Sequence, residues 1–584
     1  MNRKQRRATL KQSPSGGGHR ASPASDPVGQ LFAEAKRHQQ QNKLNDAARV
    51  YNRLLLLQPD HAEAHNNLGL VLLAQGKLAE ASARFAQALT LMPQLFEQFN
   101  GVCATLAAVL PPIGEAMRRA IAAWPNRLTA DQLLGSAWLS AIAADPLLLC
   151  LMQSIPVREI ALERVQTALR LALLEAAADA SKAVSDAALA FCCALAKQCF
   201  INEYVFVTTP DEDAQVERIE SSLADAINTT AAIAPILIAA IAMYRPLHAL
   251  PFAQQLLDRS WPPALDDVLT QQLREPGQER ELRSTIPRLT PIDDDVSLRV
   301  QQQYEENPYP RWVNVAGQIE PIALDQHMRN KFPTAAFTPL GKTESFDILV
   351  PGCGTGWQST GVVQAYQGAR VLAVDLSLSS LCFAKRMTPA SLAERIEYLQ
   401  GDILKLGAIG RTFDMIDVTG VLHHMADPIE GWRILLDLLR PDGIMHLGFY
   451  SELGRRDLMA ARAFIAERGY AATPVDIRRC RQDLLKTPLG IIARFTDFFS
   501  TSECRDMLFH VQESRMTIPA IKAFIDGHGL KFIGFDLHDT AVQNFRALFA
   551  ANGWSMTDLD KWHAVETQYP NTFSGMYQLW VQKS

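Results

Sequence analysis

The feature that most constrains this chain is a glycine turn that follows a short apolar segment. Residues 348–350 are an apolar run typical of a buried parallel strand, and glycines follow at three alternate positions, Gly352, Gly354 and Gly356. Because glycine has no Cβ, the backbone can bend tightly and approach a ligand, while the next helix presents its N-terminal amides. The next predicted strand ends at Asp375, where a carboxylate can accept hydrogen bonds from ribose hydroxyls.

Strands and helices alternate through this part of the chain. Predicted strands occupy residues 348–350, 370–374, 396–402, 413–418, 444–449, 531–536 and 575–582. We take the last of these as an edge strand. The alternation predicts an α/β doubly wound, Rossmann-like domain with a mostly parallel seven-stranded sheet.

Five motifs fall in order here. They are residues 351–356 (PGCGTG), Asp375, residues 401–402 (GD), 413–424 (FDMIDVTGVLHH) and 438–443 (LLRPDG). On these motifs the region resembles the class I S-adenosylmethionine-dependent methyltransferases. The resemblance implies an enzyme with S-adenosyl-L-methionine as cofactor that transfers a methyl group to an unidentified acceptor, either a protein or a small molecule.

The resemblance also implies which residues hold the cofactor. The expected contacts are Gly352, Cys353, Gly354 and Gly356 at the methionine part, Asp375 and Leu376 at the ribose, Asp402 and Ile403 at the adenine, and Thr419 and Gly420 near the methyl group. The chain departs from the family at Val350, where an acid usually contacts the methionine amine. This departure leaves open an adaptor with a degenerate methyltransferase fold. An NAD-binding enzyme is less favoured, because the turn lacks the GxGxxG spacing.

The candidate catalytic residues are His423 and His424, and each has two interpretations. A histidine here either packs or caps a helix, or acts as general base toward an O–H or N–H group of the acceptor. Adjacent helical residues point about 100° apart, so we expect at most one to face the site. His446 is expected to be a core histidine. No metal site is expected.

Two flanking segments are candidates for substrate selection. Residues 304–312 combine aromatic residues, prolines and an arginine, and are either a lid over the cofactor pocket or a linker packed on the domain. Residues 450–525 are an insertion of the kind that caps the acceptor site in this family. The insertion contains six arginines that either bind an acidic acceptor or form a solvated face, which we favour: Arg455, Arg456, Arg462, Arg478, Arg479 and Arg481.

A 34-residue period marks the N-terminal part of the chain. Ala47 recurs as Ala81, Tyr51 as Phe85, and each unit ends at a proline. Small residues let antiparallel helices approach, the aromatic fills the gap to the next pair, and proline ends the second helix. These units resemble the tetratricopeptide repeat, which implies a docking site for a peptide or protein partner. A purely structural scaffold is equally consistent with the pattern.

The sequence divides into five parts. They are a disordered basic tail at 1–26, tetratricopeptide-like repeats at 27–125, a helical domain at 126–285, a linker and aromatic segment at 286–340, and the class I methyltransferase domain at 341–584, which contains the 450–525 insertion. The polar stretch at 275–297 is expected to be linker. The helical domain carries no residue set that we can connect to chemistry.

Composition limits the partners and the compartment. Residues 1–25 hold six basic and no acidic residues while the chain has a net charge of −5, so its body is acidic and nucleic acid is an unexpected partner. Nine cysteines without a CxxC pair indicate free thiols and a cytoplasmic protein. Residues 226–244 are too polar for a membrane span, and no secretory leader is expected. The arrangement of repeats and methyltransferase resembles a group of bacterial proteins.

Overall fold

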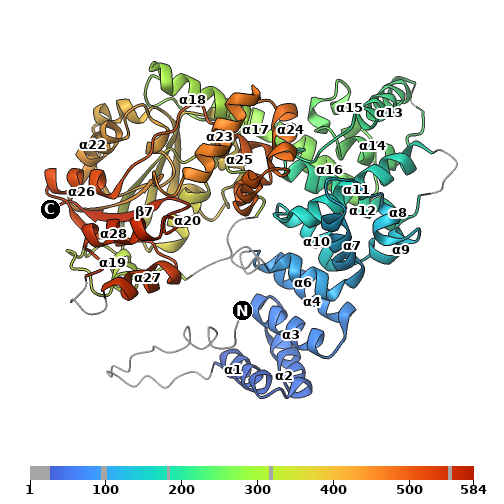
Figure 1. Cartoon of the computed structure of the whole chain (residues 1–584), viewed down its shortest axis with the longest axis horizontal. Helices are drawn as coiled ribbons and strands as arrows, with labels where there is room; N and C mark the ends of the chain where they lie inside the picture. Colours follow the sequence, from blue (N-terminus) through green and yellow to red (C-terminus); the bar gives the residue numbers. More distant parts are fainter. Residues whose placement is uncertain (1–25, 94–100, 180–183, 230, 315–319, 550–554) are drawn as a thin grey trace.

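The computed structural model describes residues 26–93, 101–179, 184–229, 231–314, 320–549 and 555–584. Apart from Asp26, the predicted basic tail lies outside these residues. Figure 1 shows a helical N-terminal half and a C-terminal half built around a sheet. Within the described part of the chain, none of the helices combines the length and apolar character that a membrane crossing needs.

In the part of the chain that the structure describes, the repeats include three antiparallel helix pairs. Their helices are α1 (Pro27–Gln40), α2 (Leu44–Leu57), α3 (Ala62–Ala74), α4 (Leu78–Leu91), α6 (Val102–Val109) and α7 (Pro111–Ala122). Ala47 and Ala81 are fully buried. A Cβ on Gly69 would lie 2.8 Å from the ring of Phe85, so α3 and α4 pack closely only because this position has no side chain. The small and aromatic positions of the 34-residue period therefore meet in space.

A helical region continues the repeats, and one apolar core runs from Ala35 to Leu273 through both. Its helices are α8 (Ala130–Leu134), α9 (Trp138–Ile142), α10 (Pro146–Ser154), α11 (Ile160–Ala178), α12 (Asp186–Ile201), α13 (Pro210–Asn228), α14 (Pro235–Ala242), α15 (Ala253–Leu257), α16 (Pro263–Leu269) and α17 (Glu275–Leu282). Helix α17 corrects the sequence analysis, which placed a linker there. Cys192, Cys193 and Cys199 are buried in α12 as free thiols.

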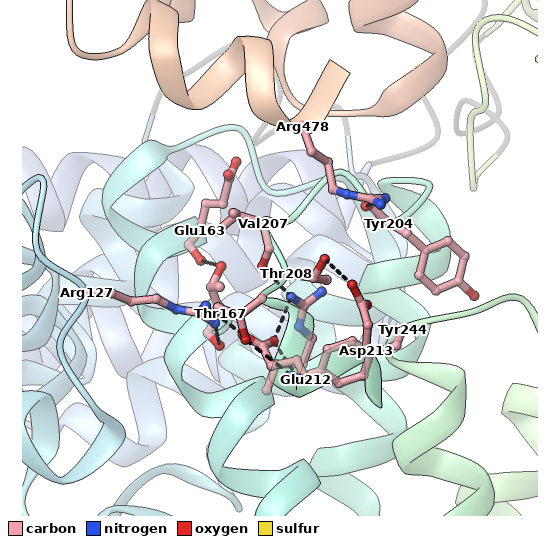
Figure 2. A network of polar contacts seen from close by, with 12 residues as sticks. Arg127, Glu163, Thr167, Tyr204, Val207, Thr208, Glu212, Asp213, Tyr244 and Arg478 are labelled. Carbon is pink, nitrogen blue, oxygen red and sulfur yellow. Dashed lines mark hydrogen bonds and ion pairs between the residues drawn. The ribbon is translucent and has the colours of Figure 1, made fainter. Parts of the chain in front are cut away.

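A buried ionic network lies inside the helical region (Figure 2). The guanidinium of Arg170 is fully buried, donates to Val207 O at 2.6 Å and lies 3.4 Å from Glu212 Oε2. Tyr244 Oη also donates a hydrogen bond to Glu212 at 2.9 Å, and Arg127 forms an ion pair with Glu212 at 2.7 Å. Because an isolated buried charge is costly, each charge here requires the others.

The sheet has the strand order β3-β2-β1-β4-β5-β7-β6. Its strands are β1 (Phe346–Pro351), β2 (Ala369–Asp375), β3 (Ile396–Gln400), β4 (Phe413–Val418), β5 (Leu439–Phe449), β6 (Lys531–Phe535) and β7 (Tyr577–Gln582). Strands β1 to β5 pair in parallel, and β7 is antiparallel to both β5 and β6. The prediction of β7 as an edge strand is wrong, because β7 lies between β5 and β6.

Helices cover both faces of the sheet. They are α19 (Leu324–Lys331), α20 (Trp357–Ala365), α21 (Leu378–Met387), α22 (Pro428–Leu438), α26 (Ile518–Gly527), α27 (Asp539–Phe549) and α28 (Leu559–Gln568). Helix α18 (Asp295–Glu306) packs beside α21. Ahead of α18, Leu289 N donates to Gln400 O at 2.7 Å, so the predicted linker runs along the edge of β3. This pairing brings α18 to the carboxyl ends of the strands.

Residues 450–517, the part of the insertion that precedes α26 and is here called the cap, lie between the sheet and the helical region (Figure 1). Its helices are α23 (Arg456–Arg468), α24 (Pro474–Leu484) and α25 (Thr501–Phe509). Arg481 is fully buried and forms two hydrogen bonds to Glu163 of α11, at 3.1 and 2.8 Å. Arg478 donates to Tyr204 O at 3.2 Å (Figure 2).

The predicted solvated face of arginines is therefore wrong for most of its members. Arg481 and Arg478 join the cap to the helical region, and Arg455 and Arg462 both pair with Glu513, at 2.6 and 3.1 Å. Sequence alone could not show this, because the acidic and carbonyl partners lie on segments distant along the chain.

We expect Arg481→Met to lower the free energy of unfolding by about 3–5 kcal/mol, because Glu163 is left buried without a cation. Thermal unfolding measures the effect, and Arg479→Met on the exposed side of α24 is the matched control. The double variant Arg481→Met/Glu163→Leu should recover most of the loss. Equal stability of Arg481→Met and the control would contradict this assignment.

Candidate functional site

A cavity of about 670 Å³ opens at the carboxyl ends of β1, β2 and β4. The turn after β1, the tips of β2 and β4, the segment before α22 and one side of α18 form its wall. Ligands of open α/β sheets bind at this end of the strands, in the crevice where neighbouring connections diverge. The cavity is therefore the candidate site.

The glycine turn has three residues with positive φ, at 69° for Gly352, 53° for Gly354 and 83° for Gly356. A Cβ on Gly352 would collide with Val421, and one on Gly354 would lie 2.7 Å from Tyr309 O. At Gly356 it would lie 2.7 Å from a methyl group of α21, and this glycine does not line the cavity. The glycines thus also permit close packing of the chain on itself.

Asp375 connects the turn to the tip of β2. Its carboxylate accepts hydrogen bonds from Gly354 N at 2.7 Å and Ser377 N at 2.8 Å. Burial raises the pKa of Asp375 to about 6, although these hydrogen bonds act to lower it. Each oxygen retains a lone pair, so a ligand hydroxyl donating into the cavity would stabilise the carboxylate.

Asp402 follows β3 and presents an unpaired oxygen. Its Oδ1 accepts from Leu404 N at 2.9 Å, whereas Oδ2 is buried and has no hydrogen-bond partner among the described residues. Burial raises the pKa of this carboxyl group. Ile403 beside it is buried and also lines the cavity. An acceptor next to an apolar side chain suits an amine on an aromatic ring.

A second acid, Asp417, lies at the tip of β4 and was not among the predicted site residues. Its Oδ1 receives hydrogen bonds from His446 Nδ1 at 3.0 Å, from Thr419 Oγ1 at 3.1 Å and from Gln358 Nε2. Burial alone would lower the pKa of His446, but Asp417 and Asp536 raise it to about 9. His446 is buried and hydrogen-bonded, as expected of a core histidine, and it also lines the cavity, where its raised pKa makes it a cation.

The two adjacent histidines have different environments. His424 lines the cavity, and its Nδ1 donates to Gln512 O at 3.0 Å, which leaves Nε2 to accept a proton. Burial lowers the pKa of His424, so the ring is neutral. His423 is fully buried, does not line the cavity and stacks on Tyr450 with ring centroids 3.6 Å apart.

A cluster of His424, Asp506 and His510 has metal-ligand spacing. Hydrogen bonds account for its arrangement. His510 Nδ1 accepts from Gln512 N at 3.0 Å, so its proton is on Nε2, which lies 3.1 Å from Tyr304 Oη. Tyr304 Oη in turn donates to Asp506 at 2.6 Å. A metal ion would have to displace that proton and the tyrosine.

The aromatic segment lies directly on the glycine turn. Tyr309 and Pro310 line the cavity, and Thr355 Oγ1 donates to Pro310 O. Trp312 Nε1 donates to Thr355 O at 3.0 Å, and its ring meets Trp357 edge to face at 5.5 Å. The segment therefore packs on the domain surface and borders the cavity at once.

Acidic groups predominate on the cavity wall, although His446 brings a positive charge to it. Six carboxylates line it, at Asp294, Asp375, Asp402, Asp417, Asp427 and Glu430. Among the described residues that line it, none is Lys or Arg. Such a wall favours a cationic or neutral ligand and disfavours a phosphate group.

Most of the predicted site residues meet at this cavity. Those that line it are Gly352, Cys353, Gly354, Asp375, Leu376, Asp402, Ile403, Thr419, Gly420 and His424. Gly356 and His423 do not. The signal that identified Asp375, an acid at the tip of a strand, also applies to Asp417. Tyr304 belongs to the segment 304–312 that was one candidate for a lid over the pocket, whereas nothing in the sequence indicated that Asp294 would reach this wall.

Family models match two parts of the chain. A model described as methyltransferase domain matches residues 349–447, and one described as tetratricopeptide repeat matches residues 32–95. The first contains the glycine turn, Asp375, Asp402 and Asp417.

Individual proteins also match parts of the chain. An uncharacterized protein of Synechococcus sp. is 28% identical over 44% of this chain and 64% of its own. Malonyl-[acyl-carrier protein] O-methyltransferase of Halalkalibacterium halodurans is 32% identical over 18% of this chain and 39% of its own. The chain thus spans less than two thirds of either relative. PKMT2 from Rickettsia typhi in complex with AdoHcy, a solved structure, has 17% identity and a TM-score of 0.35, over 45% of this chain and 53% of its own.

We expect His446 to stabilise the fold most at low pH. Because its pKa rises from 6.5 to about 9 on folding, its contribution is complete below pH 6.5 and is lost as pH rises through 9. The difference in free energy of unfolding between the wild type and His446→Gln should shrink by up to about 3 kcal/mol between pH 6 and pH 9.5. Urea unfolding followed by tryptophan fluorescence measures it, and a difference independent of pH would contradict the ion pair.

Proposed function

We propose that this chain, which joins tetratricopeptide repeats to a class I methyltransferase domain, transfers a methyl group from S-adenosylmethionine to an acceptor. The acceptor binds beneath the cap. The observation that carries the proposal is the cavity at the strand tips, where the glycine turn, Asp375 and Asp402 lie on one wall. Asp402 Oδ2 is the acceptor for the adenine amine, and Asp375 for the ribose hydroxyls. The turn borders the methionine part.

The charge of the wall supports this cofactor over a dinucleotide. When bound, S-adenosylmethionine supplies an electrophilic methyl group on a positively charged sulfonium. A nicotinamide dinucleotide would bring a pyrophosphate with two negative charges to a wall that, in its described residues, has carboxylates and neither Lys nor Arg. Residues of this chain have to orient donor and acceptor in line and exclude water.

For the acceptor, we propose an oxygen atom that loses its proton to His424. The ring is neutral, and the hydrogen bond to Gln512 O fixes the proton on Nδ1, so Nε2 is available as general base. When Nε2 takes a proton, the Gln512 carbonyl still accepts from Nδ1 and stabilises the imidazolium. Several relatives in the comparison are O-methyltransferases by name, which supports an oxygen acceptor. His423 keeps a packing role.

The role proposed for the repeats is to dock a partner or substrate protein. Leu56 and Leu57 on α2 are 82% and 60% exposed, which is unusual for two adjacent leucines and supports a contact surface there. The repeats also share one apolar core with the helical region. A docking module and a purely structural scaffold both need such a core, so the core does not distinguish between these two roles. All nine cysteines are free, which supports a cytoplasmic location.

Calorimetry tests the cofactor assignment. S-adenosylhomocysteine should bind to the wild type, and NAD should not. Asp375→Ala should weaken S-adenosylhomocysteine binding by about 1–3 kcal/mol, because ribose hydroxyls lose their acceptor. The matched control is Asp437→Ala on the exposed side of α22, which should bind like the wild type. Absence of binding to the wild type would favour the adaptor, and unchanged affinity of Asp375→Ala would remove the ribose assignment.

His424→Gln should retain S-adenosylhomocysteine binding and lower methyl transfer by about 100-fold or more, because a general base contributes 10²- to 10⁴-fold. The measurement is mass spectrometry of a bacterial lysate treated with isotope-labelled S-adenosylmethionine with and without enzyme, which also identifies the acceptor. His528→Gln at the exposed end of α26 is the control. Full transfer by His424→Gln would exclude His424 as the base.

A further inference from the structure

Strand β1 has Val350 where related methyltransferases usually have an acid. The strand beside β1 can supply a carboxylate at the same level of the sheet. Strands β1 and β4 are parallel, with Leu349 beside Ile416, so the next residues abreast are Val350 and Asp417. Residues abreast on parallel strands point to the same face of the sheet. Val350 is fully buried and apolar, whereas Asp417 lines the cavity. The neighbouring strand thus carries the carboxylate that β1 lacks.

The carboxylate of Asp417 has one oxygen committed and one available. Oδ1 accepts from His446, Thr419 and Gln358, which fixes the side chain in one orientation. Among the described residues, none donates a hydrogen bond to Oδ2. His446 bridges Asp417 to Asp536, whose oxygen lies 3.5 Å from Nε2, so one imidazolium is shared by two acids. Oδ2 is therefore the oxygen of this cavity-lining residue that is left for a ligand donor.

The other acids of the wall lie at the N-termini of helices and interact there. Asp294 caps the N-terminus of α18 through Val296 N and Ser297 N, and Asp427 caps α22 in the same way. Glu430 pairs with Arg433 on its own helix. Asp375, Asp402 and Asp417 are instead carried by strands of the sheet or by the residues directly after them, at the end of the sheet where the cavity opens.

The order of the strands matches the order of donors on the cofactor. Along S-adenosylmethionine these donors are the adenine amine, the ribose hydroxyls and the α-ammonium group. Across the sheet, Asp402 follows β3, Asp375 ends β2, the glycine turn follows β1, and Asp417 is the penultimate residue of β4. With the first two acids assigned to adenine and ribose, the ammonium group comes to lie at β4.

We propose that Asp417 binds the α-ammonium group of S-adenosylmethionine through Oδ2, in place of an acid at position 350. This inference rests on the proposed function and assigns the amino-acid end of the same site. His446 and Gln358 are positioning residues, because they hold Asp417 Oδ1 and direct Oδ2 toward the ligand. The departure at Val350 then does not imply loss of cofactor binding.

The test is a thermodynamic cycle by calorimetry. Its ligands are S-adenosylhomocysteine and the analogue in which hydrogen replaces the α-amino group. The wild type should bind S-adenosylhomocysteine about 10–100-fold more tightly than the analogue, as expected for a charge-assisted hydrogen bond. Asp417→Asn should lose this preference and bind the analogue like the wild type. Asp402→Asn is the control, since it should weaken both ligands alike through the shared adenine.

The outcomes separate the inference from the proposed function. If the wild type binds neither ligand, the proposed function fails. If the wild type binds both and Asp417→Asn keeps the preference for the amine, or weakens both ligands equally, the assignment of Asp417 is overturned. Asp417→Ser removes the carboxylate by a smaller substitution and carries the same expectation should Asp417→Asn lose its thermal unfolding transition.

Discussion

The hydrogen bond from Gly354 N to Asp375 Oδ2 determines where a ligand can lie, because it ties the turn after β1 to the tip of β2. The bond requires Gly354 to adopt positive φ, and the close approach of Tyr309 O leaves no room for a side chain there. With the turn held in this way, the cavity wall is a backbone surface bordered by acids. The aromatic segment at residues 304–312, which supplies Tyr309, packs against this turn.

Charge then selects what the cavity can hold. A wall of carboxylates whose described residues include neither Lys nor Arg pays a desolvation cost that hydrogen-bond donors or a cation from a ligand can offset. The raised pKa values of Asp375 and Asp402 express that cost. A sulfonium cofactor with an amine at each end supplies the donors and the positive charge together, which links the burial of these acids to methyl transfer.

The helical region contacts the cap, beneath which we propose that the acceptor binds. Glu163 pairs with Arg481 on α24, and Glu203 Oε2 accepts from Ser502 N at 2.6 Å at the start of α25. The same helix carries Asp506, and the chain after it reaches His424 through the Gln512 carbonyl. A region without recognisable chemistry in its sequence is thus connected by contiguous contacts to the proposed base.

The sequence by itself determined the elements whose signals are local: the alternating strands and helices, the glycine turn, the strand-tip acids and the 34-residue period. It could not decide between His423 and His424, because only the stacking on Tyr450 and the bond to Gln512 O distinguish them. The place of β7 and the pairing of Arg481 were likewise settled by tertiary structure. Local propensity and periodicity act over a few residues, whereas strand order, burial of charge and cavity lining depend on segments brought together from distant parts of the chain.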